Sequence, residues 1–66
     1  MKFKIEIPEG KKGYWAELHS PDLLNEPTMI EIDLWVVENK LGKRMAFNMW
    51  KFKNEKARNW FILRWS

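Results

Sequence analysis

His19 is the only conventional general base in this sequence, which has no Cys, two Ser and one Thr. A nucleophilic site needs a hydroxyl or thiol beside a base that a third group holds in place. His19 is followed by Ser20, and the pair fits a turn in which the imidazole is exposed or bonded locally, since a lone His seldom signals function. Thr28 fits a helix cap better than a nucleophile. The sequence therefore predicts no nucleophilic site.

Carboxylates and glycines also fail to form a recognisable site. Glu31 with Asp33 and Glu17 with Asp22 are the nearby acidic pairs, but residues two apart point in different directions on a helix and form a solvated face on a strand. One His and scattered acids lack the ligand spacing of zinc or EF-hand sites. Residues 9–13, Glu-Gly-Lys-Lys-Gly, lack the frame of a phosphate-binding loop. We expect no catalytic residue, no metal, no cofactor and no enzyme activity.

Large aromatic and basic residues alternate in the last third of the chain. Aromatic rings can stack on bases while cations contact phosphates, as in single-stranded nucleic-acid binding. Trp and Arg are also enriched at protein–protein hot spots, and lysine stems can cover the edge of a core. All three uses remain open, with a protein interface favoured. The residues expected to bind a partner are Trp50, Lys51, Lys53, Arg58, Trp60, Arg64 and Trp65. The three Trp would be apolar anchors and the four cations a polar rim.

The net charge of +3 is unevenly distributed along the chain. Residues 43–66 carry seven cations against Glu55 alone, whereas residues 14–42 carry six acids against Lys40. The molecule is therefore expected to be bipolar. Such a distribution can be neutralised within the fold, between subunits or by an anionic partner.

The first two elements are predicted to form a β-hairpin. Residues 2–7 alternate apolar and charged side chains, the pattern of a strand with one buried face. A polar loop with Gly10 and Gly13, both free to adopt positive φ, leads into a second alternating segment at 14–19.

The middle of the chain fits two structures. Alternation over 30–36 with many β-branched residues fits a strand. A helix over 29–41 is favoured, because Thr28 and Glu31 form a capping box and Gly42 provides a C-terminal stop. The stripe that this helix would present consists of Ile30, Leu34, Val37 and Leu41.

Residues 44–66 contain neither Pro nor Gly, which is unusual for two strands and a tight turn. We therefore predict helix here, with a break near Asn54 that could divide it in two, because Asn caps helices well and fits their interior poorly. The fold class is α+β, an N-terminal β-hairpin packed against one or two C-terminal helices. If the ambiguous segments were strands, the alternative would be a small all-β five-stranded barrel.

With 66 residues the chain is expected to form one domain, 1–66, whose core yields about 3–5 kcal/mol of net stability. Five Trp are more than such a core can readily enclose, so some indole surface should be available to a partner. The longest apolar runs, 34–37 and 60–63, are too short for a membrane span, and the N-terminus has no signal region. We expect a soluble protein of the cytoplasm that does not bind membranes, and the absence of Cys suits a reducing compartment.

Two segments resemble a known family. Residues 13–24, Gly-Tyr-Trp-Ala-Glu-Leu-His-Ser-Pro-Asp-Leu-Leu, resemble a W-A-E-L-R-D-P-x-x-L segment of small tail-region proteins of long-tailed bacteriophages. Residues 60–66, Trp-Phe-Ile-Leu-Arg-Trp-Ser, are similar to the helix ending in Trp-Ser of the same proteins, although His19-Ser20 replaces their Arg-Asp pair. The resemblance implies a hairpin followed by helices and a role in virion or tail assembly, in the host cytoplasm or in the virion.

These observations favour a non-enzymatic structural or assembly protein that binds other protein subunits or itself. The alternative is a small basic nucleic-acid-binding module that uses Trp, Lys and Arg.

Overall fold

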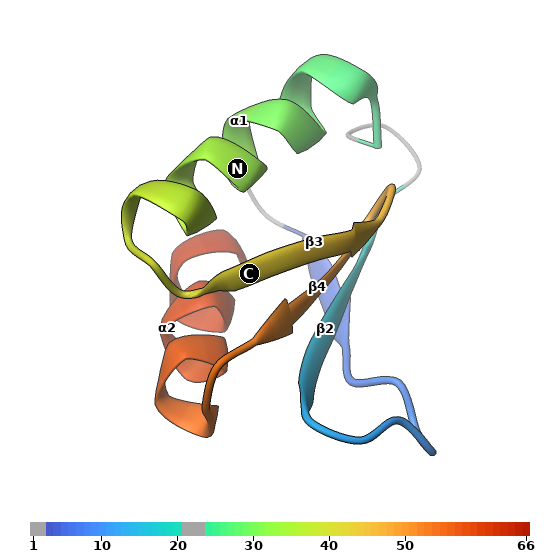
Figure 1. Ribbon diagram of the computed structural model, residues 1–66. Coiled ribbons are helices and arrows are strands. Elements are labelled where there is room, and N and C mark those ends of the chain that lie inside the picture. Colours follow the sequence, from blue (N-terminus) through green and yellow to red (C-terminus); the bar gives the residue numbers. More distant parts are fainter. Residues whose placement is uncertain (1–2, 21–23) are drawn as a thin grey trace.

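Residues 3–20 and 24–66, the part of the chain that the computed structural model describes, form two hairpins that are each followed by a helix (Figure 1). The elements are β1 (Lys4–Glu6), β2 (Tyr14–His19), α1 (Glu26–Glu38), β3 (Gly42–Ala46), β4 (Met49–Phe52) and α2 (Glu55–Trp65). The strands make one antiparallel sheet in the order β1-β2-β4-β3. The predicted α+β class is confirmed, and the all-β barrel alternative is wrong.

The predicted N-terminal hairpin is confirmed as β1 and β2, with Ile5 opposite Leu18. Gly10 and Gly13 both adopt positive φ in the connecting loop. The predicted central helix is confirmed as α1, so the strand alternative over 30–36 is wrong. The cap is Asn25, whose side chain accepts a hydrogen bond from the Thr28 amide at 3.0 Å. Thr28 therefore lies inside the helix, and the predicted capping box is incorrect.

α1 also ends earlier than expected. Its last residue is Glu38, and Lys40 takes the left-handed conformation, with φ of 55°, that a glycine commonly supplies after a helix. Gly42 instead starts β3. A Cβ added at Gly42 would lie 2.1 Å from the Lys51 carbonyl oxygen, so glycine is required there by the close approach of β4.

The prediction of helix from residue 44 is wrong for residues 44–52, which complete β3 and form the turn and β4. The turn contains no glycine because side chains stabilise it. The Arg44 Nη2 donates to the Phe47 carbonyl at 2.9 Å, and the Asn48 Nδ2 donates to the Leu18 carbonyl of β2 at 2.7 Å. The predicted break near Asn54 is confirmed, since Asn54 caps α2 and its side chain accepts from the Ala57 amide at 2.8 Å.

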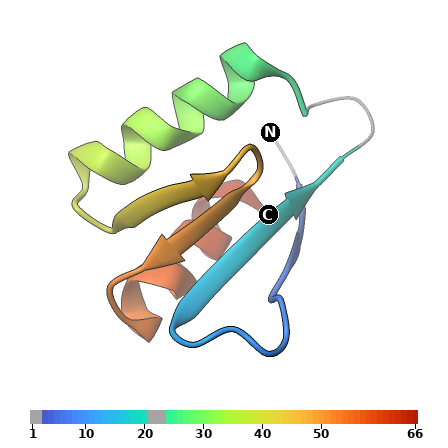
Figure 2. The same ribbon diagram turned by 45° about the vertical axis from the view of Figure 1, so that its right-hand side comes forward.

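Both helices pack on the same face of the sheet, where α1 contacts β3 and α2 contacts β2 and β4 (Figures 1 and 2). On the sheet, the buried residues that alternate toward this face are Ala16, Leu18, Trp50 and Phe52, and one side of each helix is buried as well. The largest of these fully buried side chains are Trp50, Trp65, Phe61, Leu18, Met29, Ile32 and Val36. In the described part of the chain, the opposite face of the sheet carries no helix.

Phe61 lies at the centre of the core. Its ring centroid is 4.9 Å from that of Phe52 and 5.5 Å from that of Trp50. Trp50 also donates a hydrogen bond from its indole nitrogen to Asp33 Oδ1 at 3.1 Å, which connects β4 to α1. Trp35 lies between the helices, with its ring edge-on to those of Trp60 and Trp65.

We expect Gly42→Ala to lower the free energy of unfolding by about 3 kcal/mol, because the new methyl group would collide with the backbone of β4. Gly10→Ala is the matched control: its added Cβ meets nothing within 4 Å, and only its φ of +79° is unfavourable, at about 1 kcal/mol. Urea denaturation followed by circular dichroism measures both. Equal losses for the two variants would contradict this account of β3 and β4.

Candidate protein-binding surface

α1 is apolar on two opposite sides. Met29, Ile32 and Val36 are buried against the sheet and α2. Ile30, Leu34 and Val37 are 46%, 56% and 57% exposed, and their spacing places them on one line along the side away from the core. We call these three residues the outer stripe. The sequence pattern correctly grouped these three on one side of a helix, but the core uses the other side. Leu41, the fourth residue of the predicted stripe, lies beyond the end of α1 and is buried in the core.

The surroundings of the outer stripe are acidic. Glu31 and Glu38 are exposed beside it, and the sequence of α1 contains no Lys, Arg or His. Glu26, in the first turn, lies 3.4 Å from Arg44 of β3 and is partly neutralised. The outer stripe is therefore a line of apolar side chains bordered by carboxylates that face solvent.

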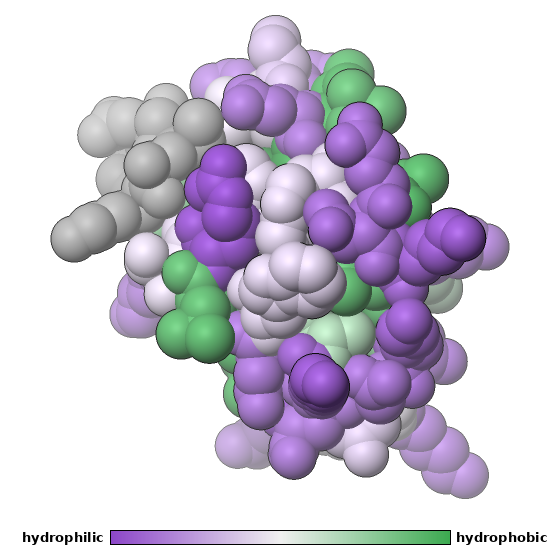
Figure 3. Space-filling view, turned by 90° about the vertical axis from the view of Figure 1, so that its left-hand side faces the viewer, coloured by the Kyte–Doolittle hydropathy of each residue, from purple (hydrophilic) through white to green (hydrophobic). Residues whose placement is uncertain are grey.

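α2 also presents exposed apolar and basic side chains. We call the surface that α1 and α2 form, on the face of the sheet that they cover, the helical side. Trp60 is 49% exposed and Leu63 is 81% exposed. Lys56 and Arg64 are exposed on the same helix, within one turn of Trp60. We call these four residues the α2 surface. Figure 3 views the molecule from the helical side and shows hydrophobic and pale side chains separated by hydrophilic ones.

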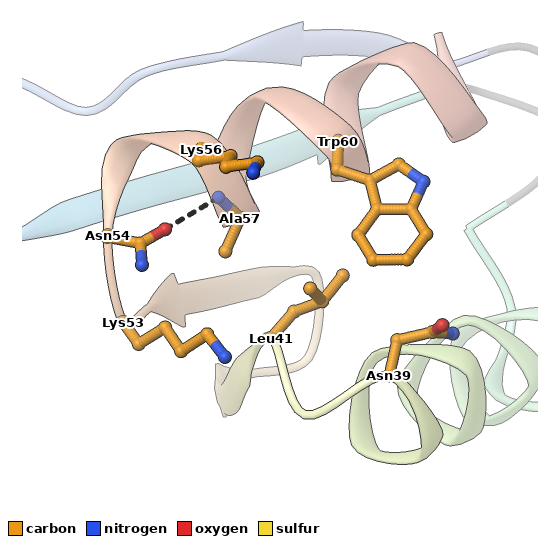
Figure 4. Close-up of a pocket in the computed structure, with 7 residues that line it drawn as sticks. All are labelled: Asn39, Leu41, Lys53, Asn54, Lys56, Ala57 and Trp60. Carbon is orange, nitrogen blue, oxygen red and sulfur yellow. Dashed lines mark hydrogen bonds between the residues drawn. The ribbon is translucent and has the colours of Figure 1, made fainter.

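A pocket of about 320 Å³ lies where the end of α1 approaches the start of α2 (Figure 4). Leu41, Ala57 and Trp60 supply its apolar surface. Lys53 and Lys56 also line it, on either side of the Asn54 cap. The remaining lining residue, Asn39, donates its side-chain amide to the Trp35 carbonyl at 2.8 Å.

The side chains that line this pocket are apolar, amide or ammonium-bearing. Among the described residues that line it, none carries a carboxylate, an imidazole or a thiol. An apolar floor next to two ammonium groups suits an apolar side chain that lies beside a carboxylate.

Two of the predicted anchors are in the wrong place for a partner. Trp50 and Trp65 are fully enclosed in the core. Trp50 points inward because the alternation of β4 places it on the same side as Phe52, against Phe61. Trp65 packs edge-on against Trp35 at 5.9 Å. Of the three predicted anchors, Trp60 alone is exposed.

The four predicted rim cations are also divided between surfaces. Lys51 lies on the uncovered face of the sheet, because it alternates with Trp50 and Phe52. Arg58 is mostly buried, with its guanidinium 5.4 Å from the centre of the Tyr14 ring. Lys53 lines the pocket beside Trp60 and also borders a depression along β3, and Arg64 lies one turn from Trp60 on α2. Sequence reasoning did not name Leu63 or the outer stripe as binding residues, although the second apolar periodicity of α1 was a usable signal.

Within residues 3–20 and 24–66, no three His, Cys, Asp or Glu side chains gather in a way that could hold a metal ion. Neither helix of this described part is long and apolar enough to cross a membrane. Comparison of the chain with protein-family models, with curated proteins and with solved structures finds no match. The function is therefore inferred from the geometry of the surface.

The different positions of Trp60 and Trp65 can be tested by truncation. Trp65→Ala should lower the free energy of unfolding by about 3–5 kcal/mol, which is comparable to the whole stability expected for a domain of this size. Trp60→Ala should cost only about 1 kcal/mol, because it loses mainly the edge contact with Trp35. Thermal unfolding of both variants distinguishes them, and an equal loss would show that Trp60 belongs to the core.

Proposed function

We propose that this protein is a non-enzymatic structural or assembly protein that binds other protein subunits, and that the subunit it binds through its helical side is a second copy of itself. The observation that carries the proposal is the complementarity of its own two helices. One presents exposed apolar residues bordered by acids, and the other presents exposed apolar residues bordered by bases.

When α1 of one copy contacts α2 of another, exposed apolar residues meet apolar residues, and the acidic residues of α1 meet the basic residues of α2. The outer stripe would meet Trp60 and Leu63, while Glu31 and Glu38 would lie near the cations of the α2 surface. Aromatic anchors surrounded by complementary charges are the usual composition of a specific interface. Contact between two α1 helices would instead bring carboxylates together, which is unfavourable.

The pocket between α1 and α2 also fits the α1 helix of a second copy. Leu34 and Glu38 are one helical turn apart on α1, so an apolar side chain and a carboxylate project from neighbouring positions. The pocket offers an apolar surface with Lys53 and Lys56 beside it. The α1 helix of a second copy therefore supplies the two groups that this pocket suits.

A contact between unlike surfaces can close into a small ring or continue as a chain of subunits. Either outcome is useful to an assembly protein. The resemblance of residues 13–24 and 60–66 to phage tail-region proteins supports a virion or tail module as the setting, in the host cytoplasm or the virion. The part of that resemblance at residues 21–23 lies outside the described residues.

Charge exchange tests this proposal. Wild-type protein should show a mass that rises with concentration in sedimentation experiments. The double variant Glu31→Lys with Glu38→Lys should abolish the association, because α1 and α2 then both present cations. The double variant Lys56→Glu with Arg64→Glu should also abolish it, because α1 and α2 then both present anions. Mixing the two double variants should restore association, since each then offers the charge that the other lacks.

Lys11→Glu with Lys12→Glu is the control. It changes the net charge by the same amount as the basic-to-acidic pair but lies in the loop between β1 and β2, on neither helix. It should leave the association intact. A wild type that stays monomeric at every concentration, or a mixture of the two double variants that stays monomeric while each remains folded by circular dichroism, would refute the proposal.

A further inference from the structure

The uncovered face of the sheet has its own chemistry, distinct from that of the helical side. The residues that alternate toward it include Lys4, Glu6, Glu17, Lys43 and Lys51, together with Trp15, His19 and Met49, and Met45 is exposed beside Lys43 and Lys51. Strand pairing places Trp15 opposite Lys51, and Lys51 opposite Lys43 on the next strand. One indole and two ammonium-bearing side chains therefore form a row across β2, β4 and β3.

The indole of Trp15 is held in place. Its nitrogen donates a hydrogen bond to the Lys12 carbonyl at 2.7 Å, which fixes the ring against the loop that precedes β2. The ammonium groups of Lys11 and Lys51 lie 4.8 Å and 5.8 Å from the ring centre. Trp15 remains partly exposed, and these ammonium groups lie over its ring. A base that stacks on the ring would displace them toward its own phosphates.

The positive charge around Trp15 is not compensated within the described chain. Lys43 and Lys51 are direct cross-strand neighbours, and like charges in that position destabilise a sheet. Across residues 3–20 and 24–66, no carboxylate forms an ion pair with Lys11, Lys12, Lys43 or Lys51.

The acids of this face are occupied elsewhere. Glu6 and Glu17 are opposite each other on β1 and β2, and they contact Lys4 and His19 at 3.8 Å and 2.9 Å. Lys43, Lys51 and Lys53 also border a shallow depression of about 410 Å³ along β3, whose apolar lining comes from Met45 and Phe52. The basic end of the face is thus an open, cationic surface that would gain stability from an anion.

We propose that this surface binds single-stranded nucleic acid, with a base stacked on Trp15 and backbone phosphates on Lys11, Lys43 and Lys51. A flat aromatic ring beside cations matches an unpaired base beside its phosphate, and an uncovered antiparallel sheet is a known platform for this arrangement. An acidic peptide would satisfy the lysines but would leave the ring without a stacking partner. The site lies on the opposite face of the sheet from the helices, so it is independent of the proposed self-association.

Of the residues that the sequence suggested for a partner, Lys51 alone belongs to this site. Trp15 and Lys11 come from the N-terminal hairpin, and Lys43 comes from β3. The proposed nucleic-acid site therefore differs from the one that the sequence suggested. Strand register brings these residues together, although they are far apart in the sequence.

The test uses the intact protein and a fluorescently labelled oligo(dT) of about 12 nucleotides, which is within the length that one small binding fold covers. Anisotropy should report binding that weakens with salt, with a log–log slope of about −2 for three phosphate contacts. Trp15→Ala should weaken binding about tenfold, and Trp15→Phe should restore most of it because a ring is present again. Lys43→Gln with Lys51→Gln should weaken binding and make the salt slope shallower.

The matched control is Phe47→Ala, which removes an exposed aromatic ring from the turn between β3 and β4, at the other end of these strands from Lys43 and Lys51, and should not change the affinity. A duplex of the same length should bind more weakly than oligo(dT), since its bases are not available for stacking. Absence of binding at low salt would overturn the proposal. Two other results would also overturn it, because each would show a general attraction to polyanions. In one, Trp15→Ala leaves the binding unchanged; in the other, polyglutamate competes as well as unlabelled oligo(dT) does.

Discussion

The packing of Phe61 against Trp50 and Phe52 is the contact on which the rest of the structure depends. It fixes α2 on the sheet, and the hydrogen bond from the Trp50 indole to Asp33 connects β4 to α1. Large rings thus fill a core that has no disulfide, and in the described part of the chain no charged residue lies fully inside it, although Arg58 is mostly buried at its edge. Since these rings all lie on one side of the sheet, the core uses one face of the sheet and one side of each helix.

This one-sided core leaves two surfaces of different character. The helical side presents exposed Leu, Ile, Val and Trp side chains, with acids on α1 and bases on α2. The uncovered sheet face presents lysines around Trp15, with its acids paired at the other end. The uneven charge of the sequence is therefore distributed in space as three regions, an acidic helix, a basic helix and a basic sheet end. Self-association would use the first two and leave the third free.

Sequence reasoning succeeded where a local pattern and the tertiary structure agree. The alternation in β1 and β2 and the cap at Asn54 were readable because each depends on nearby residues. The second hairpin was missed because its turn is stabilised by side chains of Arg44 and Asn48, the latter bonding to β2 thirty residues away. Trp50 was wrongly predicted to be exposed, because the direction of its side chain depends on which residues of β4 alternate toward the core. Trp15 was overlooked because its cationic neighbours, Lys51 and Lys43, become adjacent only through the register of three strands.

We propose that the outer stripe of α1 and the α2 surface are the two halves of one contact between copies. The most direct measurement is a series of nitrogen–proton NMR spectra recorded as the protein is diluted. If these two surfaces meet, the shifts are confined to the amides around Ile30, Leu34 and Val37 on α1 and around Trp60 and Leu63 on α2, and the strand amides are unchanged. Spectra that do not change with concentration, or shifts that appear on the sheet and spare the helices, would contradict it.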